Sequence, residues 1–353
     1  MNKIKVYLLP GKHAQRTPFA YPDYRPFFIP YFDFVTEPLA ADFIVASYFV
    51  DLRSEAAQLL AWQKARPALK LVVFSEEPLW DSLWYEDFIK PTGQFSVKIN
   101  GVNHTLKYDF LNHATTDIFN FVQLPYFITT ENHYIQRYAK LLAGNLQLTA
   151  QQLLTLWQNV RYRHAFMAEK RTEAKYHKVN QSGELLGLSV YRSELAAQFL
   201  SHRTASVQGR GWHSDTARQA LPDWHLDKLT SLHGNVMLMS AIENTVLGNY
   251  ITEKPFDAFA INAIPITYAG PDSRLYDVIN KNEDAVVNIF GMSVDEATQA
   301  LRELEPTVDS AERYQAAQQA VLQKVQSFPL LIAERERVAF SSFFAFERLL
   351  SLE

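Results

Sequence analysis

Residues 242–254 carry the most information about architecture, and they read Ile242-Glu243-Asn244-Thr245-Val246-Leu247-Gly248-Asn249-Tyr250-Ile251-Thr252-Glu253-Lys254. The chain continues through Pro255 and Phe256 to Ile264-Pro265-Ile266 and Gly270-Pro271. This pattern predicts a polar loop, a helix that starts after Thr252, a buried strand and a turn. Polar groups gather where the loop meets the helix, and α/β proteins build pockets for anionic ligands at such places.

The bulk composition bounds the class of protein. At roughly 150 residues per domain, a chain of 353 residues predicts two domains. A hydrophobic content of 48% and a formal net charge of −4 describe a globular protein without a basic field for nucleic acid. The absence of cysteine excludes disulfides, thiolate metal sites and cysteine nucleophiles, and it suits a reducing cytoplasm. With no signal peptide and no apolar run of about 18 residues, we expect no transmembrane segment and at most peripheral membrane contact.

Short apolar runs alternate with helical spans in both halves of the chain. This alternation predicts parallel sheets and a Rossmann-like α/β fold for each half. We expect an N-terminal domain over residues 1–160 and a C-terminal domain over residues 161–353. One alternative is that the last helix packs back on the N-terminal domain. The less regular spans predict a strand over 117–126 and mostly helix over 132–175. Ser54 is the expected N-cap of a helix that runs to about Arg66.

The segment from Leu238 to Pro271 resembles the α-1,3/α-1,4-fucosyltransferase family, glycosyltransferase family 10. The family motif reads approximately F-E-N-S, a short variable stretch, Y-[IV]-T-E-K, and a [VI]-P-[VI] strand that ends in G-[PS]. Three further segments resemble the family less specifically: Val190 to Leu195 its F-Y-x-x-L helix, Val207 to Gly211 the turn after it, and Val73 to Pro78 its acidic loop.

The resemblance implies a GT-B fold, in which two Rossmann-like domains face a central cleft. It implies an inverting, metal-independent enzyme that transfers fucose from GDP-fucose to a glycan hydroxyl, with no cofactor besides the nucleotide sugar. The N-terminal domain would bind the acceptor and the C-terminal domain the donor. Such an enzyme would serve glycan biosynthesis in the cytoplasm.

The donor-site candidates have the chemistry that a sugar diphosphate requires. Fixed hydrogen-bond donors and cations neutralise the leaving diphosphate without reorganising, and the first turn of a helix offers free N–H groups. By the resemblance, and with Thr252 as the helix cap, the donor-site candidates are Asn244, Tyr250, Ile251, Thr252, Glu253 and Lys254, with Arg192 and Arg210 as further basic candidates. The alternative is a polar helix cap with a surface Glu–Lys pair.

Glu76 and Glu77 follow a hydrophobic strand directly, where α/β proteins place catalytic groups. An inverting transferase needs a base for the proton of the acceptor hydroxyl, and a carboxylate suits that task. The E-S-P form of the family loop points to Glu76 and the G-E-N form to Glu77, and of the two we favour Glu76 as the base. The alternative is an acidic helix N-terminus.

One departure from the family concerns the diphosphate. The family carries an arginine between the first strand of its C-terminal domain and the F-Y-x-x-L helix. With Lys178-Val179 as that strand, the loop over residues 180–188 has no basic residue, and Lys178, Arg192 or Arg210 would have to substitute. Two alternatives therefore stay open: transfer of another sugar from another nucleotide, or a non-catalytic carbohydrate-binding protein. No D-x-D motif and no H-E-x-x-H motif occurs, so we expect no metal site.

Overall fold

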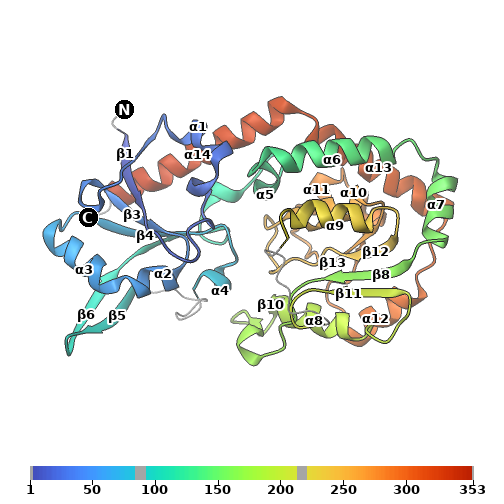
Figure 1. Ribbon diagram of the computed structural model, residues 1–353, viewed down its shortest axis with the longest axis horizontal. Helices are drawn as coiled ribbons and strands as arrows, with labels where there is room; N and C mark the ends of the chain where they lie inside the picture. The colour runs from blue at the N-terminus through green and yellow to red at the C-terminus, as the bar shows by residue number, and fades with distance from the viewer. Residues whose placement is uncertain (1–2, 84–92, 213–220, 352–353) are drawn as a thin grey trace. The chain divides into compact units, whose positions relative to one another are not determined.

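A computed structural model describes residues 3–83, 93–212 and 221–351 (Figure 1). The chain divides into two compact units, and each has its own sheet. Unit 1 contains residues 1–122, 129–132 and 331–353, and unit 2 contains residues 123–128 and 133–330. Both sheets are parallel, so the predicted α/β class is confirmed.

Unit 1 is built on a five-stranded sheet in the order β2-β1-β3-β4-β7. Its strands are β1 (Ile4–Leu8), β2 (Phe32–Phe34), β3 (Phe43–Ala46), β4 (Lys70–Phe74) and β7 (Asp109–Leu111). Its short helices are α1 (Arg25–Phe28), α2 (Phe49–Ser54), α3 (Ala56–Ala65) and α4 (Leu79–Ser82). Numbered within the sheet, this order is 2-1-3-4-5, a doubly wound order whose switch point lies between the first and third strands.

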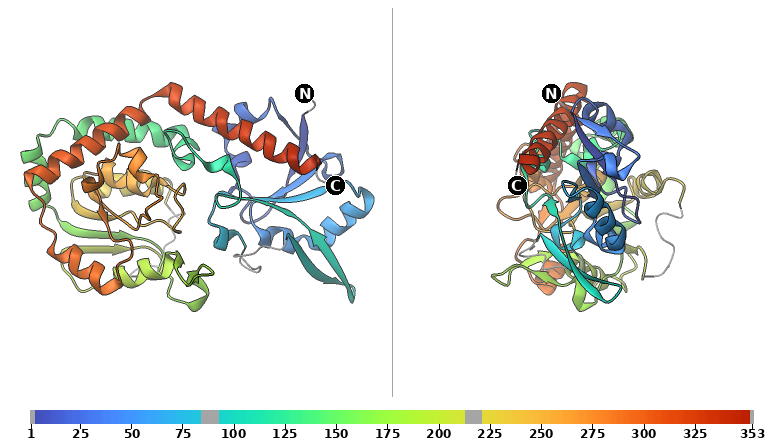
Figure 2. Two further views of the ribbon diagram at one scale, coloured as in Figure 1. Left: turned by 180° about the vertical axis from the view of Figure 1, so that it is seen from behind. Right: turned by 90° about the vertical axis from the view of Figure 1, so that its left-hand side faces the viewer.

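A separate hairpin of β5 (Gln94–Ile99) and β6 (Val102–Lys107) belongs to unit 1 and is visible from behind in Figure 2. Its two-residue turn is Asn100-Gly101, with φ values of 50° and 82°. Both angles are positive, as a type I′ turn requires, and Asn-Gly is the residue pair that adopts this turn most readily.

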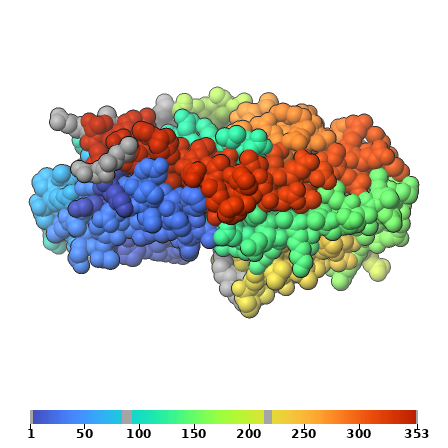
Figure 3. All heavy atoms as spheres, turned by 90° about the horizontal axis from the view of Figure 1, so that it is seen from above, coloured from blue at the N-terminus to red at the C-terminus, as the bar shows by residue number. Residues whose placement is uncertain are grey.

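The helix α14 (Phe328–Ser351) completes the core of unit 1 and contributes part of the surface seen in Figure 3. The Phe346 ring lies 5.0–5.7 Å from the rings of Phe19, Phe32, Phe43 and Phe74. Edge-to-face contacts of this kind stabilise beyond the area that they bury. Within the described ranges, no helix has the length and apolarity needed to cross a membrane.

Unit 2 repeats the same strand order in the sheet β11-β8-β12-β13-β14, again all parallel. Its strands are β8 (Tyr162–Met167), β11 (Ala205–Gln208), β12 (Val236–Ser240), β13 (Ile264–Thr267) and β14 (Val287–Asn288). Its helices are α5 (Tyr126–Thr129, at the junction with unit 1), α6 (Asn132–Asn145), α7 (Ala150–Gln158), α8 (Ser189–Ala197), α9 (Trp224–Leu232), α10 (Glu253–Ala260), α11 (Leu275–Val278), α12 (Val294–Glu303) and α13 (Val308–Val325). In Figure 1, α9 and α10 lie on one face of the sheet and α8 and α12 on the other.

Three expectations are wrong. Residues 117–126 contain a 3-10 turn and no strand, and the fifth strand of unit 1 is β7 instead. Residues 162–167 form β8, although we expected helix there, and β9 (Lys178–Val179) pairs only with β10 (Leu185–Gly187) in a small antiparallel sheet. Ser54 ends α2 and does not cap α3, whose N-cap is Glu55.

Buried His164 in β8 should make unit 2 sensitive to acid. Its Nε2–H donates to the Leu301 carbonyl at 3.0 Å, and burial lowers the pKa of His164 from 6.5 to about 4. The unfolded chain therefore binds more protons between these two values, so stability is present at neutral pH and is lost as the pH falls from about 6.5 to about 4. The expected loss is about 3 kcal/mol. Urea unfolding at both ends of this range measures it, and a His164→Gln chain should lose less; an equal loss in both chains would contradict this assignment.

Candidate functional site

The donor-site candidates of unit 2 lie in the loop after β12 and at the start of α10. Thr252 is the N-cap of α10, since its Oγ1 accepts from the Lys254 N–H at 3.5 Å. Pro255 lies in the first turn, where a missing N–H costs little. The predicted cap is therefore confirmed, and the loop and helix meet as the sequence indicated.

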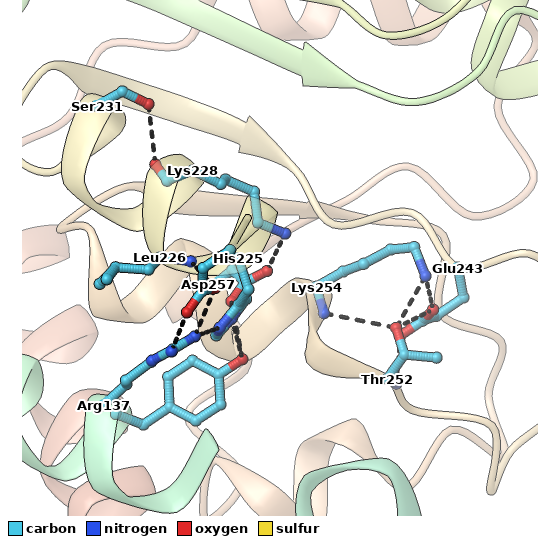
Figure 4. A network of polar contacts seen from close by, with 11 residues as sticks. Arg137, His225, Leu226, Lys228, Ser231, Glu243, Thr252, Lys254 and Asp257 are labelled. Carbon is cyan, nitrogen blue, oxygen red and sulfur yellow. Dashed lines mark hydrogen bonds and ion pairs between the residues drawn. The ribbon is translucent and has the colours of Figure 1, made fainter. Parts of the chain in front are cut away.

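The Glu243 carboxylate binds the tip of α10 (Figure 4). It accepts from the Thr252 N–H at 2.7 Å, from the Thr252 hydroxyl at 2.8 Å and from Lys254 Nζ at 2.8 Å. We expected Lys254 and the tip to face a diphosphate. The structure instead supplies an internal anion there, because a carboxylate at a helix N-terminus meets the same donors that a phosphate would.

Burial raises the pKa of Glu243, and the neighbouring Lys254 ammonium acts in the opposite direction. The two side chains are mostly buried, with 14% and 20% of their surface exposed. Each therefore depends on the other for its counter-charge. Sequence reasoning quoted Glu243 within the motif but gave it no role.

Arg192 joins the motif loop to α8. Its NH1 donates to Asn244 Oδ1 at 2.8 Å and to the Ile242 carbonyl at 3.2 Å. Asn244 Nδ2 lies 3.4 Å from the Tyr250 hydroxyl. The structure thus brings Arg192, Asn244 and Tyr250 together, as predicted, while Ile251 is buried beside them.

Sequence reasoning missed Arg171 because it took the wrong segment as the first strand. The first strand of unit 2 is β8, so the loop that leads to α8 covers residues 168–188 and contains Arg171. The Arg171 N–H donates to Ser193 Oγ at 2.8 Å, which places it against the helix that carries Arg192. The loop where the family carries an arginine is therefore not devoid of basic residues.

The bond from the Arg171 backbone to Ser193 brings two basic residues, Arg171 and Arg192, near each other close to the switch point of the unit 2 sheet. Burial lowers the pKa of Arg192 to about 10, and the charge of Arg171 contributes to this shift. In the part of the chain that the structure describes, Arg192 Nε is buried without a hydrogen-bond partner. A bound anion would relieve both costs.

Arg210 lies after β11 and is linked to Arg171 through the carboxylate of Glu169. Its Nε donates to Glu169 Oε1 at 2.8 Å, while Arg171 NH2 lies 3.2 Å from Glu169 Oε2. One carboxylate therefore serves two arginines, and with Arg192 the group has an excess of positive charge. Glu253, the first residue of α10, also raises the pKa of Arg192, which places its carboxylate in the same field.

A second network of polar contacts joins α10 to α6 and α9 (Figure 4). The buried Asp257 carboxylate pairs with Lys228 of α9, accepts from the Tyr138 hydroxyl at 2.8 Å and lies 2.7 Å from His225 Nε2. Arg137 NH1 lies 3.1 Å from His225 Nδ1 and can only donate, so Nε2 carries the hydrogen of this imidazole. These bonds hold the helix that presents Glu253 and Lys254.

In unit 1, the predicted acidic pair lies after β4 and is bound by two residues that sequence reasoning missed. Arg16 NH1 is 3.8 Å from Glu76 Oε1 and 3.4 Å from Glu77 Oε1. The Tyr21 hydroxyl donates to Glu76 at 2.7 Å. Although burial acts against the charged guanidinium, Glu77 and Glu76 raise the pKa of Arg16.

The two carboxylates differ in access. The Glu76 side chain is 0% exposed, whereas 11% of the Glu77 side chain is exposed. Both lie at the carboxyl edge of a parallel sheet, the predicted setting for a catalytic group. The sequence favoured Glu76 as the base, but Glu77 has the greater access to solvent. Among the described residues, no group of three His, Asp or Glu side chains is arranged to hold a metal ion.

Two solved structures are among those that match this chain. No protein-family model matches the sequence, and no curated protein matches it. One structure is an α1,3-fucosyltransferase with GDP-fucose, with 13% identity, a TM-score of 0.45, and coverage of 96% of this chain and 90% of that one. The second is an α1,3-fucosyltransferase with 13% identity, a TM-score of 0.46, and coverage of 99% and 89%. Because both TM-scores are below 0.5, the functional proposal rests on this chain's own residues.

Proposed function

We propose that this chain is an inverting glycosyltransferase that uses a nucleoside-diphosphate sugar, and that the donor is GDP-fucose. The observation that carries the proposal is Arg192, which donates to Asn244, has a buried nitrogen without a partner among the described residues, and lies next to Arg171 near the switch point of the unit 2 sheet. Doubly wound sheets bind ligands at this point, and two like charges with a buried, unpartnered guanidinium nitrogen favour a bound anion. Arginine is suited to phosphate because its fork donates two parallel hydrogen bonds. The motif of residues 242–254 and its resemblance to fucosyltransferases narrow the anion to a sugar diphosphate.

The donor site of this proposal lies in the C-terminal domain predicted over residues 161–353. Arg171 and Arg192 would bind the diphosphate, with Arg210 supporting Arg171 through Glu169. Glu253, Asn244 and Tyr250 would bind hydroxyl groups of the ribose or sugar. Glu243 and Lys254 would shape the helix tip from within, which revises the direct phosphate contact expected of Lys254.

The chemical step is a displacement at the anomeric carbon. The acceptor oxygen forms a bond to that carbon, the bond to the diphosphate oxygen breaks, and Glu77 takes the hydroxyl proton. The arginines receive the negative charge that develops on the diphosphate, so no metal ion is needed in this scheme. Glu76 would hold Arg16 and Tyr21 beside the base, in the N-terminal domain predicted over residues 1–160. We propose a glycan as the acceptor and the cytoplasm as the setting.

Thermal unfolding with GDP, UDP, ADP or CMP tests the donor. A nucleotide at about 100 times its dissociation constant should add roughly 2.7 kcal/mol to the stability of the state that binds it. We expect GDP alone to raise the unfolding temperature, and GDP-fucose to be hydrolysed slowly to GDP and fucose. Stabilisation by UDP or CMP alone would show that the donor is not GDP-fucose, and the transferred sugar would then be another one. A chain that no nucleotide stabilises would not be a transferase of this kind, and one that binds GDP-fucose without ever turning it over would be a binding protein.

A further inference from the structure

His13 and Asp51 form a pair at the switch point of the unit 1 sheet, outside the acidic pair already described. His13 lies in the loop after β1, and Asp51 lies in the first turn of α2, directly after β3. His13 Nδ1 is 3.2 Å from Asp51 Oδ1. In a doubly wound sheet the first and third strands are neighbours, but the connections after them leave toward opposite faces, and this leaves a crevice for ligands at their carboxyl ends.

The contact with Asp51 engages one ring nitrogen of His13 and determines the hydrogen-bonding role of the other. An ionised carboxylate can only accept, so His13 Nδ1 carries the hydrogen and Nε2 keeps its lone pair. The His13 side chain is 30% exposed, whereas that of Asp51 is 8% exposed. The ring also packs on Tyr48, with centroids 4.4 Å apart. A buried carboxylate and an aromatic ring thus orient a half-exposed imidazole whose Nε2 is an acceptor.

The pair is not needed to fasten its loop. The loop is already held by the Leu9 N–H on the Val45 carbonyl at 2.8 Å, by Ser47 Oγ on the Ala14 carbonyl at 3.3 Å and by the Glu76 N–H on the Arg16 carbonyl at 3.3 Å. The last of these bonds also joins the loop directly to the acidic pair. A purely structural role would not require a partly exposed imidazole at this edge.

The backbone is shaped to admit the Asp51 carboxylate. A Cβ built on Gly11 would lie 2.9 Å from both Cγ and Oδ1 of Asp51, closer than side-chain atoms approach each other. In the described part of the chain, the second oxygen of Asp51 is buried without a hydrogen bond. His13 is therefore the principal partner of this carboxylate, and Gly11 makes room for it.

We propose that His13, oriented by Asp51, binds the acceptor by accepting a hydrogen bond at Nε2 from one of its sugar hydroxyls. This rests on the proposed function, and it adds a specificity-determining residue on the acceptor side. The ligand class is a pyranose with neighbouring hydroxyl groups: one hydroxyl reacts at the acidic pair and another binds His13. Asp51 is a positioning residue, because it acts only through the imidazole.

The test compares variants of the full chain with methyl pyranosides of glucose, galactose and N-acetylglucosamine as acceptors. The main variant is His13→Phe combined with Asp51→Asn, which keeps a ring on Tyr48 and leaves no buried charge without a partner. With the pyranoside that the wild type uses best, its acceptor KM should rise roughly 2- to 12-fold, the effect of one neutral hydrogen bond. The donor KM and kcat should change by less than about 2-fold.

Two single variants separate positioning from binding. Asp51→Asn keeps the imidazole but lets an amide N–H meet Nδ1, which turns Nε2 into a donor, and it should raise the acceptor KM alone. Gly11→Ala should do the same by displacing the carboxylate. His104→Gln, on the hairpin, is the matched control and should leave both KM values unchanged.

The result that would overturn the proposal is an unchanged acceptor KM in the folded double variant. A fall in kcat at constant acceptor KM would also overturn it, because His13 would then be a base and not a binding group. NMR of the His13 ring gives a readout that needs no turnover: its resonance should shift when the pyranoside is added in the presence of GDP, and no shift would refute the contact. If no nucleotide binds and no transfer occurs, the proposed function fails. The NMR shift of the His13 ring still shows whether a pyranoside binds at His13.

Discussion

Glu77→Gln is expected to lower the turnover number of sugar transfer by roughly 100- to 10,000-fold. Glutamine keeps the shape of the side chain but cannot take the proton of the acceptor hydroxyl. The affinity for GDP should stay within about 2-fold, because the proposed diphosphate ligands belong to unit 2. Initial rates of transfer and thermal shifts with GDP, measured on the same preparation, give the two quantities.

Glu76→Gln is the matched control for this prediction. The Glu76 side chain is buried and accepts a hydrogen bond from the Tyr21 hydroxyl. The glutamine amide in its place should weaken the contact with Arg16, so the main effect should be a lower free energy of unfolding of unit 1, with a smaller loss of turnover than in Glu77→Gln. The opposite ranking of the two turnover numbers would make Glu76 the base. Full turnover in both variants would place the base elsewhere.

Arg192→Gln should weaken GDP binding roughly 10- to 100-fold, the value of a charge-assisted hydrogen bond to phosphate. Unfolding of the nucleotide-free chain should be little affected, because burial and the charge of Arg171 already act against a charged Arg192. Arg192→Lys should recover only part of the affinity, since an ammonium lacks the bidentate fork. Calorimetric titration with GDP and urea unfolding without it measure the two effects.

Lys254→Met provides the contrast within the same unit. It leaves the Glu243 carboxylate at the helix tip without its cation, so the free energy of unfolding of unit 2 should fall by about 2–4 kcal/mol. Adding Glu243→Gln should restore much of this loss. A stable Lys254→Met chain that no longer binds GDP would instead give Lys254 the direct phosphate contact that the sequence suggested.

Local chemistry made much of unit 2 predictable from sequence. Thr252 before Glu253 is a cap signal that acts within one turn, and it is found as the cap. The motif residues Asn244 and Tyr250 lie together because a single loop carries them. Sequence patterns succeed where the deciding interactions are between near neighbours.

The missed features depend on distant partners. Residues 162–167 have no Gly or Pro to separate them from the preceding helix, and only pairing with β11 and β12 makes them a strand. That error hid Arg171. At the carboxyl edge of the unit 1 sheet, the contacting residues are far apart in the sequence: His13 and Asp51 by 38 residues, Tyr21 and Glu76 by 55, and Arg16 and Glu77 by 61. A pattern within a short stretch of sequence cannot relate residues at such separations. The role of Glu243 was missed for another reason. The N-terminus of a helix binds any anion, and the sequence does not show whether that anion is a carboxylate of the protein or a bound ligand.

The position of α14 in the core of unit 1 has a consequence for biosynthesis. Phe346 contacts Phe19, Phe32, Phe43 and Phe74, so these rings lack this packing partner until 272 to 327 further residues have been made. Unit 2 starts later along the chain but has all its strands and helices through α13 before α14 is translated. Native packing of the later unit can therefore precede that of the earlier one, the reverse of the N-terminal-first order that is usual during synthesis. The nascent N-terminal sheet would expose its aromatic face in the meantime, which makes it the segment most in need of a chaperone.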